Sequence, residues 1–287
     1  MAKKSEYKRY TRSSAGNVMY FVFLSIMGIF SIIPMIYCIC TAFKPLDELL
    51  VFPPRFFVHR PTLENFLVIP SLLNKLQVPL SRYIFNSGFV SIVTTFFNII
   101  VASMAAFALS KSRLKYRNIF FIIIQFSLLY NTATLSIPQY LVFNVLSIID
   151  TFWVYILPAV ASSMGVFLMK QYIDSSIPDS LLEAAKIDGA ATFTIYRKIV
   201  MPITKPAWMT LILFSFQSIW SATPAQGTIF SEEMKTLPYV MTSITAGGIA
   251  RAGASMAVTV ILMLPPIVVY FISQSNVMET MSTAGIK

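Results

Sequence analysis

Long stretches without a charged side chain are the feature that most constrains what this chain can fold into. Six such windows interrupt the charged residues, and a transmembrane helix needs about 20 predominantly apolar residues. They are Asn17–Phe43, Tyr83–Ser110, Asn118–Ile149, Thr151–Met169, Pro206–Ser231 and Ala252–Met278. The pattern predicts an all-α, polytopic membrane protein with six transmembrane helices within residues 17–278. The third and fifth windows exceed one helix, so each is expected to hold a span and part of a loop.

Composition supports the membrane location. Only 12% of the 287 residues are charged, against about 25% in soluble domains, and 56% are hydrophobic. The first window is longer than the apolar core of a cleavable signal peptide, and no A-x-A cleavage site follows it. We therefore expect the first helix to remain as a membrane anchor.

The distribution of Lys and Arg predicts the topology, because cations near span ends are retained on the cytoplasmic side. With the N-terminus inside, 15 of the 22 cations fall in inner segments and seven in outer ones. Both termini are therefore predicted to be cytoplasmic, with a basic segment at residues 1–16 and a tail at residues 279–287. This placement also accounts for the net charge of +10 without nucleic acid, whose binding would need a basic stripe on one folded face.

No catalytic or metal site is predicted. Cys38 and Cys40 lie two residues apart in the first window, where they point to different sides of a helix and are interpreted as small apolar residues. His59 stands in an outer loop without the partners that a metal ligand or general base would have.

The first outer segment, residues 44–82, holds six of the sixteen prolines. Because proline fixes φ and removes a donor, we predict an ordered, extended cap with at most short helices, one of them starting near Thr62–Phe66. The cap is either an ordinary connector or a docking surface for an outer partner, and the sequence leaves both open.

The inner segment, residues 170–205, shows the signals of a helix on the cytoplasmic face. Ser176, Pro178 and Asp179 place a capping hydroxyl, a first-turn proline and an acid at the helix start. Gly189 suits the left-handed turn that ends such a helix.

A second short helix fits residues 192–200, with Thr192 as its cap and with Pro202 and Pro206 ending it. Small side chains gather at the corner between the two helices. This pattern favours docking into a partner's cleft over an amphipathic hairpin in the lipid interface, which usually sets bulky residues opposite a basic face.

The same segment resembles a known family motif. The residues are Glu183-Ala184-Ala185-Lys186-Ile187-Asp188-Gly189-Ala190, followed by Tyr196, Ile199, Pro202 and Pro206. This run is similar to the EAA loop of the permease subunits of bacterial ATP-binding-cassette (ABC) importers, and it lies before the last two of six predicted spans, as in that family.

The resemblance to carbohydrate-type permeases covers about residues 44–287. Matching positions are Thr62–Phe66, Asn86-Ser87, Ala105–Ser110, Ile137-Pro138, Thr151–Trp153, Leu157-Pro158, Pro265-Pro266, Gln274 and the tail Gly285–Lys287. The tail is similar to that of the six-helix, maltose-type inner-membrane subunit. Residues Ser221–Pro224 and Thr280–Ser282 depart from the family pattern.

The resemblance implies a type I ABC importer permease fold and no enzymatic activity. The chain would form half of the translocation pathway for a sugar or oligosaccharide in the bacterial inner membrane. It has no G-x-x-x-x-G-K-[ST] phosphate loop, so ATP and Mg²⁺ would bind to a separate ATPase, with no cofactor on this chain. The implied partners are a second homologous permease, two ATPase subunits and an extracytoplasmic solute-binding protein that meets the cap.

The resemblance also implies roles for single residues. Glu183 would pair with a basic group on the ATPase, Ala184 and Ala185 would pack in its groove, Gly189 would permit the turn, and Asp188 would cap the following backbone. Ile199 and Pro202 complete the implied set of ATPase-coupling positions.

Two alternatives stay open. The EAA core also occurs in importers of peptides, polyamines and phosphonates, so only the flanking matches favour sugar. A stand-alone secondary transporter is the other alternative, although such proteins often place ionisable residues at mid-membrane and the six windows contain none.

Overall fold

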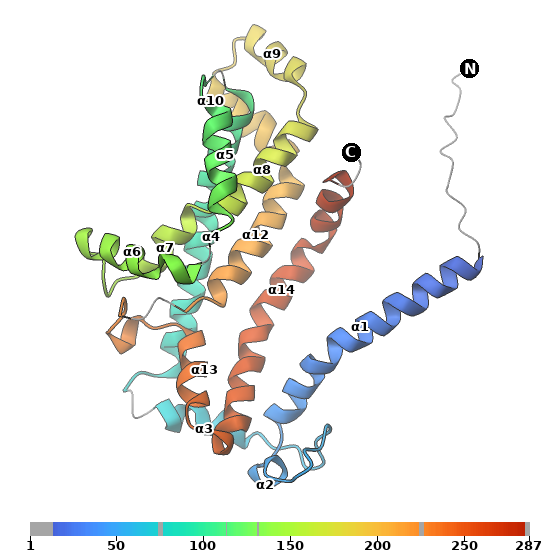
Figure 1. Cartoon of the computed structure of the whole chain (residues 1–287), viewed down its shortest axis with the longest axis vertical. Helices are drawn as coiled ribbons and strands as arrows, with labels where there is room; N and C mark the ends of the chain where they lie inside the picture. The colour runs from blue at the N-terminus through green and yellow to red at the C-terminus, as the bar shows by residue number, and fades with distance from the viewer. Residues whose placement is uncertain (1–13, 74–76, 113, 131, 224–226, 285–287) are drawn as a thin grey trace.

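The computed structural model describes residues 14–73, 77–112, 114–130, 132–223 and 227–284, and the regular elements in these ranges are helices. Four of them lie side by side along the long axis in Figure 1: α4 (Leu80–Lys111), α8 (Ser163–Ser176), α12 (Lys205–Trp220) and α14 (Ala252–Ala284). Helix α1 (Ser14–Ala42) meets α14 near one end of the molecule and leans away from it towards its own N-terminus.

The predicted six continuous spans are not reached among the described residues. Four helices are long and apolar enough to cross a membrane: Gly16–Ala42, Leu80–Lys111, Trp153–Ser176 and Ile249–Ser275. A fifth span results if Thr192–Ile203 and Lys205–Trp220, which meet at 78°, are counted as one. The predicted cytoplasmic location of both termini stays a prediction. Residues 1–13 and 285–287 lie outside the described ranges, and α14 continues past the predicted span end at Met278 to Ala284.

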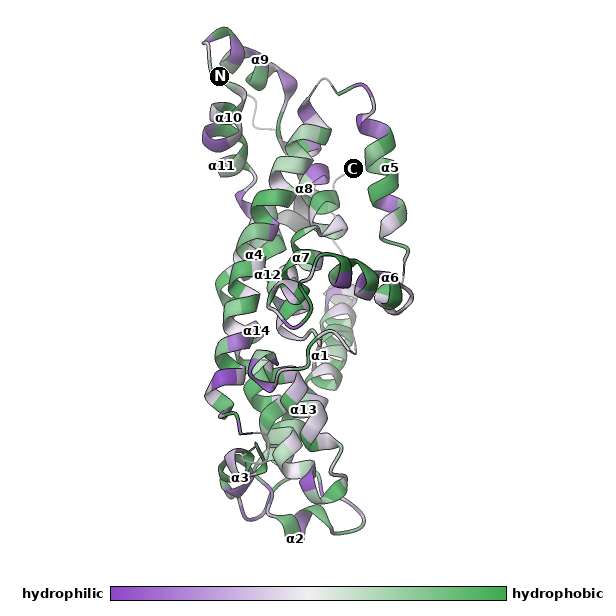
Figure 2. Ribbon diagram, turned by 90° about the vertical axis from the view of Figure 1, so that its left-hand side faces the viewer, coloured by the Kyte–Doolittle hydropathy of each residue, from purple (hydrophilic) through white to green (hydrophobic). Residues whose placement is uncertain are grey.

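The third window accounts for the missing span. It is divided between α5 (Arg117–Ser127) and α6 (Thr132–Val145), and α6 lies across the direction of the long helices in Figures 1 and 2. With 11 residues, α5 rises only about 16 Å, roughly half of the hydrocarbon core of a bilayer. The absence of charge shows where lipid is tolerated but not where the chain turns, so a sixth span in this window is not confirmed by the described residues.

Close packing of α4, α8 and α12 depends on a glycine. A Cβ added at Gly165 of α8 would lie 3.1 Å from Leu211 Cδ1 and 3.2 Å from Ala102 Cβ, so the three helices approach each other where Gly165 lacks a side chain. Asn98 of α4 lies beside this point, and its Nδ2 donates to the carbonyls of Ala159 and Val160 at 3.0 Å each. These carbonyls are at the C-terminal end of α7 (Trp153–Val160), where they have no partner within the helix. The Asn98 amide supplies the hydrogen bonds that lipid cannot provide.

Buried apolar residues form clusters in both halves of the molecule. One cluster joins the C-terminal half of α4 to α8 and the start of α12, with Met169, Ile173 and Val200 among its fully buried members. Another joins the start of α4 to α3, α14 and α13 (Leu237–Thr245). Trp220 also ties α12 to α14, because its Nε1 donates to the carbonyl of Leu262 at 2.9 Å. The long helices therefore pack against one another in both halves of the bundle.

The cap contains short helices, as predicted. Helix α2 (Leu46–Leu49) and helix α3 (Glu64–Leu73) lie at the end of the molecule opposite α9 in Figure 1. Short 3-10 helices also precede α13 (Glu232–Met234) and α14 (Ile249–Arg251). Figure 2 shows hydrophobic residues along most of the long helices, with hydrophilic residues frequent around α9 and around α2 and α3.

Candidate functional site

Helix α9 (Asp179–Ile187) carries three of the seven predicted coupling residues, Glu183, Ala184 and Ala185, and lies at one extreme of the molecule. It follows directly on α8, with Ile177 and Pro178 between them. Ile177 is 1% exposed and Leu182 is 5% exposed, and both belong to the cluster formed by α4, α8 and α12. Leu182 is the one residue of α9 that is buried. The helix is therefore seated on the bundle by a narrow apolar edge.

The end of α9 has the geometry predicted for Gly189. Its φ is +78°, in the left-handed region, and its N–H donates to the Lys186 carbonyl at 3.0 Å. The Ala190 N–H donates to the Ala185 carbonyl at 3.0 Å. This pair of bonds is a Schellman motif, which satisfies the last carbonyls of the helix and reverses the chain. Asp188 is the C-cap residue, and its backbone N–H donates to the Ala184 carbonyl.

The two predicted side-chain caps were wrong. Ser176 is the last residue of α8, and Pro178, which cannot cap through its side chain, is the N-cap of α9. Ala191, not Thr192, is the N-cap of α10 (Thr192–Ile195). The observed N-cap lies two residues from the expected hydroxyl in α9 and one residue from it in α10, a shift that local sequence signals do not resolve.

The seven predicted coupling residues differ in exposure. Glu183, Ala184, Asp188 and Gly189 are exposed, and Ile187 beside them is 86% exposed, which is unusual for a large apolar side chain. Ala185 and Ile199 are half-buried and pack against the chain's own apolar cluster. Pro202 is exposed and lies within α11 (Met201–Ile203), so it does not end the helical segment as predicted.

The segment at residues 196–208, which follows α9 and α10, is held in place by side-chain hydrogen bonds. Between α10 and α11 the chain forms a π-helix, Tyr196–Val200. The Tyr196 hydroxyl shares a hydrogen bond of 2.7 Å with Ser103 Oγ of α4. At the 78° bend, Thr204 Oγ1 donates to the Val200 carbonyl at 2.9 Å and Trp208 Nε1 donates to the Met201 carbonyl at 3.0 Å. These side chains satisfy carbonyls where the regular helical pattern is interrupted.

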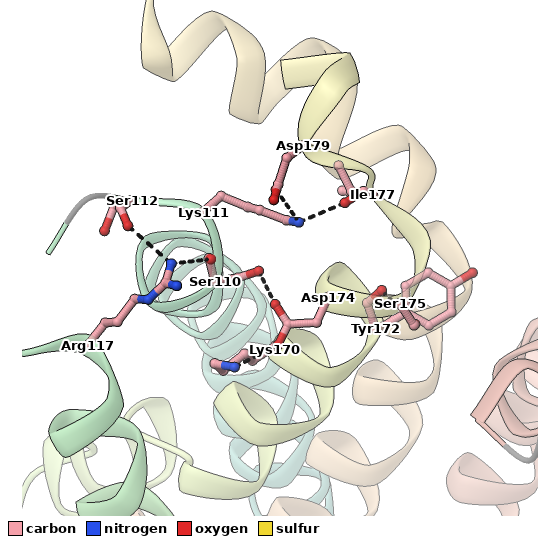
Figure 3. Close-up of polar contacts among 10 residues, drawn as sticks. All are labelled: Ser110, Lys111, Ser112, Arg117, Lys170, Tyr172, Asp174, Ser175, Ile177 and Asp179. Carbon is pink, nitrogen blue, oxygen red and sulfur yellow. Dashed lines mark hydrogen bonds and ion pairs between the residues drawn. The ribbon is translucent and has the colours of Figure 1, made fainter. Parts of the chain in front are cut away.

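A polar network beneath α9 was not identified from the sequence. Figure 3 shows Lys111, the last residue of α4, between α8 and α9. Its Nζ donates to the Ile177 carbonyl at 2.7 Å and lies 2.8 Å from Asp179 Oδ1. Asp174 of α8 accepts hydrogen bonds from Ser110 and from Lys170, the latter at 2.6 Å. Lys111 and Lys170 served only as topology signals in the sequence, because a separation of 68 positions between Lys111 and Asp179 hides their proximity.

The charge of Lys111 affects Asp179. The hydrogen bond and the positive charge of Lys111 hold the pKa of the Asp179 carboxyl below its usual value. Asp179 is also the first residue of α9, where a negative charge is favoured by the helix dipole. The carboxylate therefore stays ionised at neutral pH and the ion pair is formed.

A cavity of about 930 Å³ opens between α5, α6, α7, α8 and α12. Its lining is mostly apolar, and its polar side chains are Ser127, Tyr130, Gln139, Ser162, Ser163, Ser215 and Ser218. Ser127 Oγ of α5 donates to Ser163 Oγ of α8 at 2.6 Å, which joins two of the walls. The described residues that line this cavity include no Asp, Glu, Lys, Arg or His. Such a lining offers hydroxyl and amide hydrogen bonds but no charge.

Comparisons with known proteins agree with the fold. Residues 9–282 match the family model described as "Binding-protein-dependent transport system inner membrane component". The chain is similar to the sulfoquinovosyl glycerol transport system permease protein SmoH of Agrobacterium fabrum, with 28% identity over 95% of each chain. It is also similar to the arabinooligosaccharides transport system permease protein AraQ of Bacillus subtilis, with 25% identity over 94% of each chain.

A solved structure shares the architecture. One chain of a bacterial ABC transporter involved in the import of the acidic polysaccharide alginate superposes with a TM-score of 0.71 and 23% identity, over 93% of this chain and 99% of that one. The match confirms the type I ABC importer permease fold. The chain belongs to the binding-protein-dependent transport system inner membrane components, and it is therefore a multi-pass permease subunit of a bacterial ABC importer and not an enzyme.

Proposed function

We propose that this permease forms half of the translocation pathway for a sugar or oligosaccharide and receives its drive through α9 from a separate ATPase subunit. ATP and Mg²⁺ bind to that ATPase, and this chain carries no cofactor. The complete importer contains a second homologous permease, two ATPase subunits and an extracytoplasmic solute-binding protein that contacts the cap at residues 44–82.

The observation that carries the coupling role is the exposure of α9 on a firmly held base. Glu183, Ala184 and Ile187 are exposed together with Phe193 on α10, so an acid, a small side chain and two large apolar side chains face away from the chain's own core. An exposed apolar surface rimmed by polar residues is typical of a protein interface. Ala185 packs inward, so Ala184 and Ile187, more than Ala185, supply the contact surface to the ATPase.

Charge reversal tests the coupling role. In the importer purified from its host membranes through a tag on this chain, Glu183→Lys should reduce solute uptake by about tenfold or more, because it places a cation opposite a basic group. Membrane insertion should be unchanged. The control is Gln171→Lys, which adds a positive charge at an exposed position of α8. Normal uptake by Glu183→Lys would overturn the coupling assignment.

The cavity supports a neutral, hydroxyl-rich solute. Sugar hydroxyls can exchange hydrogen bonds with Ser, Tyr and Gln side chains, and the apolar remainder of the lining suits the faces of sugar rings. A polyamine would need carboxylates to replace its hydration, and none lines this cavity among the described residues. The names of relatives such as AraQ, an arabinooligosaccharide permease, support the same class.

The solute class is tested by uptake competition. Proteoliposomes containing the importer and its binding protein are supplied with a panel of neutral oligosaccharides, acidic oligosaccharides, peptides and phosphonates. We expect neutral oligosaccharides to compete for uptake and to stimulate ATP hydrolysis. Competition by peptides or phosphonates alone would reject the carbohydrate assignment while leaving the importer role intact.

A further inference from the structure

Lys111 is nearly buried although it ends a helix at the surface of the bundle. Its side chain is 9% exposed, whereas the side chain of its partner Asp179 is 78% exposed. An ammonium group is strongly hydrated, so burial of the lysine stem is favourable only if the charged tip finds acceptors. The tip has two, the Ile177 carbonyl at 2.7 Å and Asp179 Oδ1 at 2.8 Å.

The two acceptors lie at the junction of α8 and α9. Ile177 is the C-cap of α8, and the following residue is Pro178, the N-cap of α9. Asp179 is the first residue of α9. A single ammonium group from the end of α4 therefore holds the last carbonyl of one helix and the first carboxylate of the next, as Figure 3 shows.

The end of α4 is itself held in place. Arg117, the first residue of α5, donates from Nη1 to the Ser110 carbonyl at 3.0 Å. Ser110 donates from its hydroxyl to Asp174 of α8, which also pairs with Lys170 at 2.6 Å. These contacts join the cytoplasmic ends of α4, α5 and α8 and give Lys111 a fixed position (Figure 3).

Lys111 attaches α9 to the bundle through polar contacts, in addition to the apolar contact made by Leu182. Within α9 only Leu182 is buried. A force on the exposed face of α9 would therefore rotate the helix about its contact at Leu182, unless the first turn of α9 were also attached to the bundle. We propose that Lys111 is a positioning residue that clamps the first turn of α9 to α4, so that a displacement of α9 is passed to α4 and not lost in a tilt. This inference rests on the coupling role proposed for α9.

The principal test replaces Lys111 by Met, which keeps the aliphatic length and removes the donor. In the assembled importer we expect Lys111→Met to lower the solute transported per ATP hydrolysed by about tenfold, the size of effect that loss of one charge-assisted hydrogen bond has on an equilibrium. Lys111→Arg keeps a donor and should restore most of the ratio. Lys115→Met, which removes an exposed cation from the same segment, should leave the ratio unchanged.

A purely structural role predicts a different result. It would lower the yield and thermal stability of the complex, while each assembled complex would keep the normal ratio of transport to ATP hydrolysis. That outcome for Lys111→Met would overturn the inference.

Asp179→Asn is the second variant, because it alters only the exposed acceptor. We expect it to assemble normally and to lose part of the coupling ratio, since the bond to the Ile177 carbonyl remains. If Lys111→Met fails to assemble and Asp179→Asn couples normally, Lys111 is structural and the inference is rejected. Failure of the underlying coupling role is separate, because Glu183→Lys would then transport normally.

Discussion

At the scale of single residues, buried charges lie where irregular backbone would otherwise lack hydrogen-bond partners. Lys111 serves the Ile177 carbonyl, and Glu48, which is 7% exposed, accepts from the N–H groups of His59 at 3.1 Å and Arg60 at 2.9 Å. Lys44, 3% exposed, donates to the Arg55 carbonyl within the same cap. Proline-rich and junction segments have few regular hydrogen bonds, so single charged side chains hold their shape.

Glu48 offers a test of this role. The His59 backbone hydrogen bond, aided by that of Arg60, holds the pKa of the Glu48 carboxyl below its usual value. The stabilisation is therefore fully present above the ordinary glutamate pKa and is lost as the pH falls through the lowered one. We expect Glu48→Gln to speed hydrogen exchange at the His59 and Arg60 amides several-fold at neutral pH, because one N–H would face an amide NH₂.

The exchange experiment has a matched control in Glu64→Gln, an exposed acid at the start of α3. Exchange corrected for its intrinsic pH dependence should rise in acid for the unaltered chain but not for Glu48→Gln. Equal protection of both amides in the two proteins would show that the carboxylate does not hold the cap.

At the scale of helices, close approach depends on small side chains in facing positions. Gly165 of α8 faces Ala102 of α4, and both are buried, with Leu211 of α12 beside them. Small residues let backbones approach within the membrane, where helices gain stability from packing more than from the hydrophobic effect. This contact brings α4 together with α8 and α12, the helices that precede and follow residues 177–204.

Gly165→Val should therefore weaken the packing. The added side chain would overfill a contact that is already 3.1–3.2 Å from an added Cβ, and overpacking of this kind typically costs about 1–3 kcal/mol. We expect a lower melting temperature in detergent and reduced yield. Gly88→Val on α4 is the comparison, because nothing lies within 4 Å of a Cβ added there; an equal loss in both variants would argue against a specific contact at Gly165.

At the scale of the whole molecule, α8 and α12 line the cavity and also flank the segment at residues 177–204 that contains α9. Helix α8 contributes Ser163 to the cavity, its N-cap residue Ser162 also lines the cavity, and the helix ends at the junction held by Lys111. Helix α12 contributes Ser215 and Ser218 and begins at the bend below the loop. Under the coupling role proposed for α9, a displacement there would reach the cavity through these two helices, as rigid-body switching between inward-facing and outward-facing states requires.

Ser218→Arg distinguishes a neutral from an acidic solute. Ser218 is exposed and lines the cavity. An arginine there should reduce uptake of a neutral saccharide, because a large cation would occupy the path without a counter-charge. An acidic saccharide would instead retain or gain uptake. Ser218→Thr, which keeps the hydroxyl, is the control, and uptake is measured with labelled solute in proteoliposomes.

Local signals in the sequence predicted several features correctly. Gly189 was expected to end a helix in the left-handed conformation, and its φ is +78°. The prolines of residues 44–82 were expected to limit the cap to short helices, and α2 and α3 are short. Each depends on the conformational preferences of residues close together in the chain, which an amino-acid sequence reports directly.

The sequence by itself determined that this is an apolar, helical membrane protein with a helix that ends at Gly189, because hydropathy and turn chemistry act over a few residues. Only the tertiary structure decided that the third window bends into α5 and α6, that Lys111 meets Asp179, and that one uncharged cavity gathers its hydroxyls from several helices. These features depend on residues far apart in the chain. Their proximity is set by how the helices pack, and no periodicity within a single segment records it.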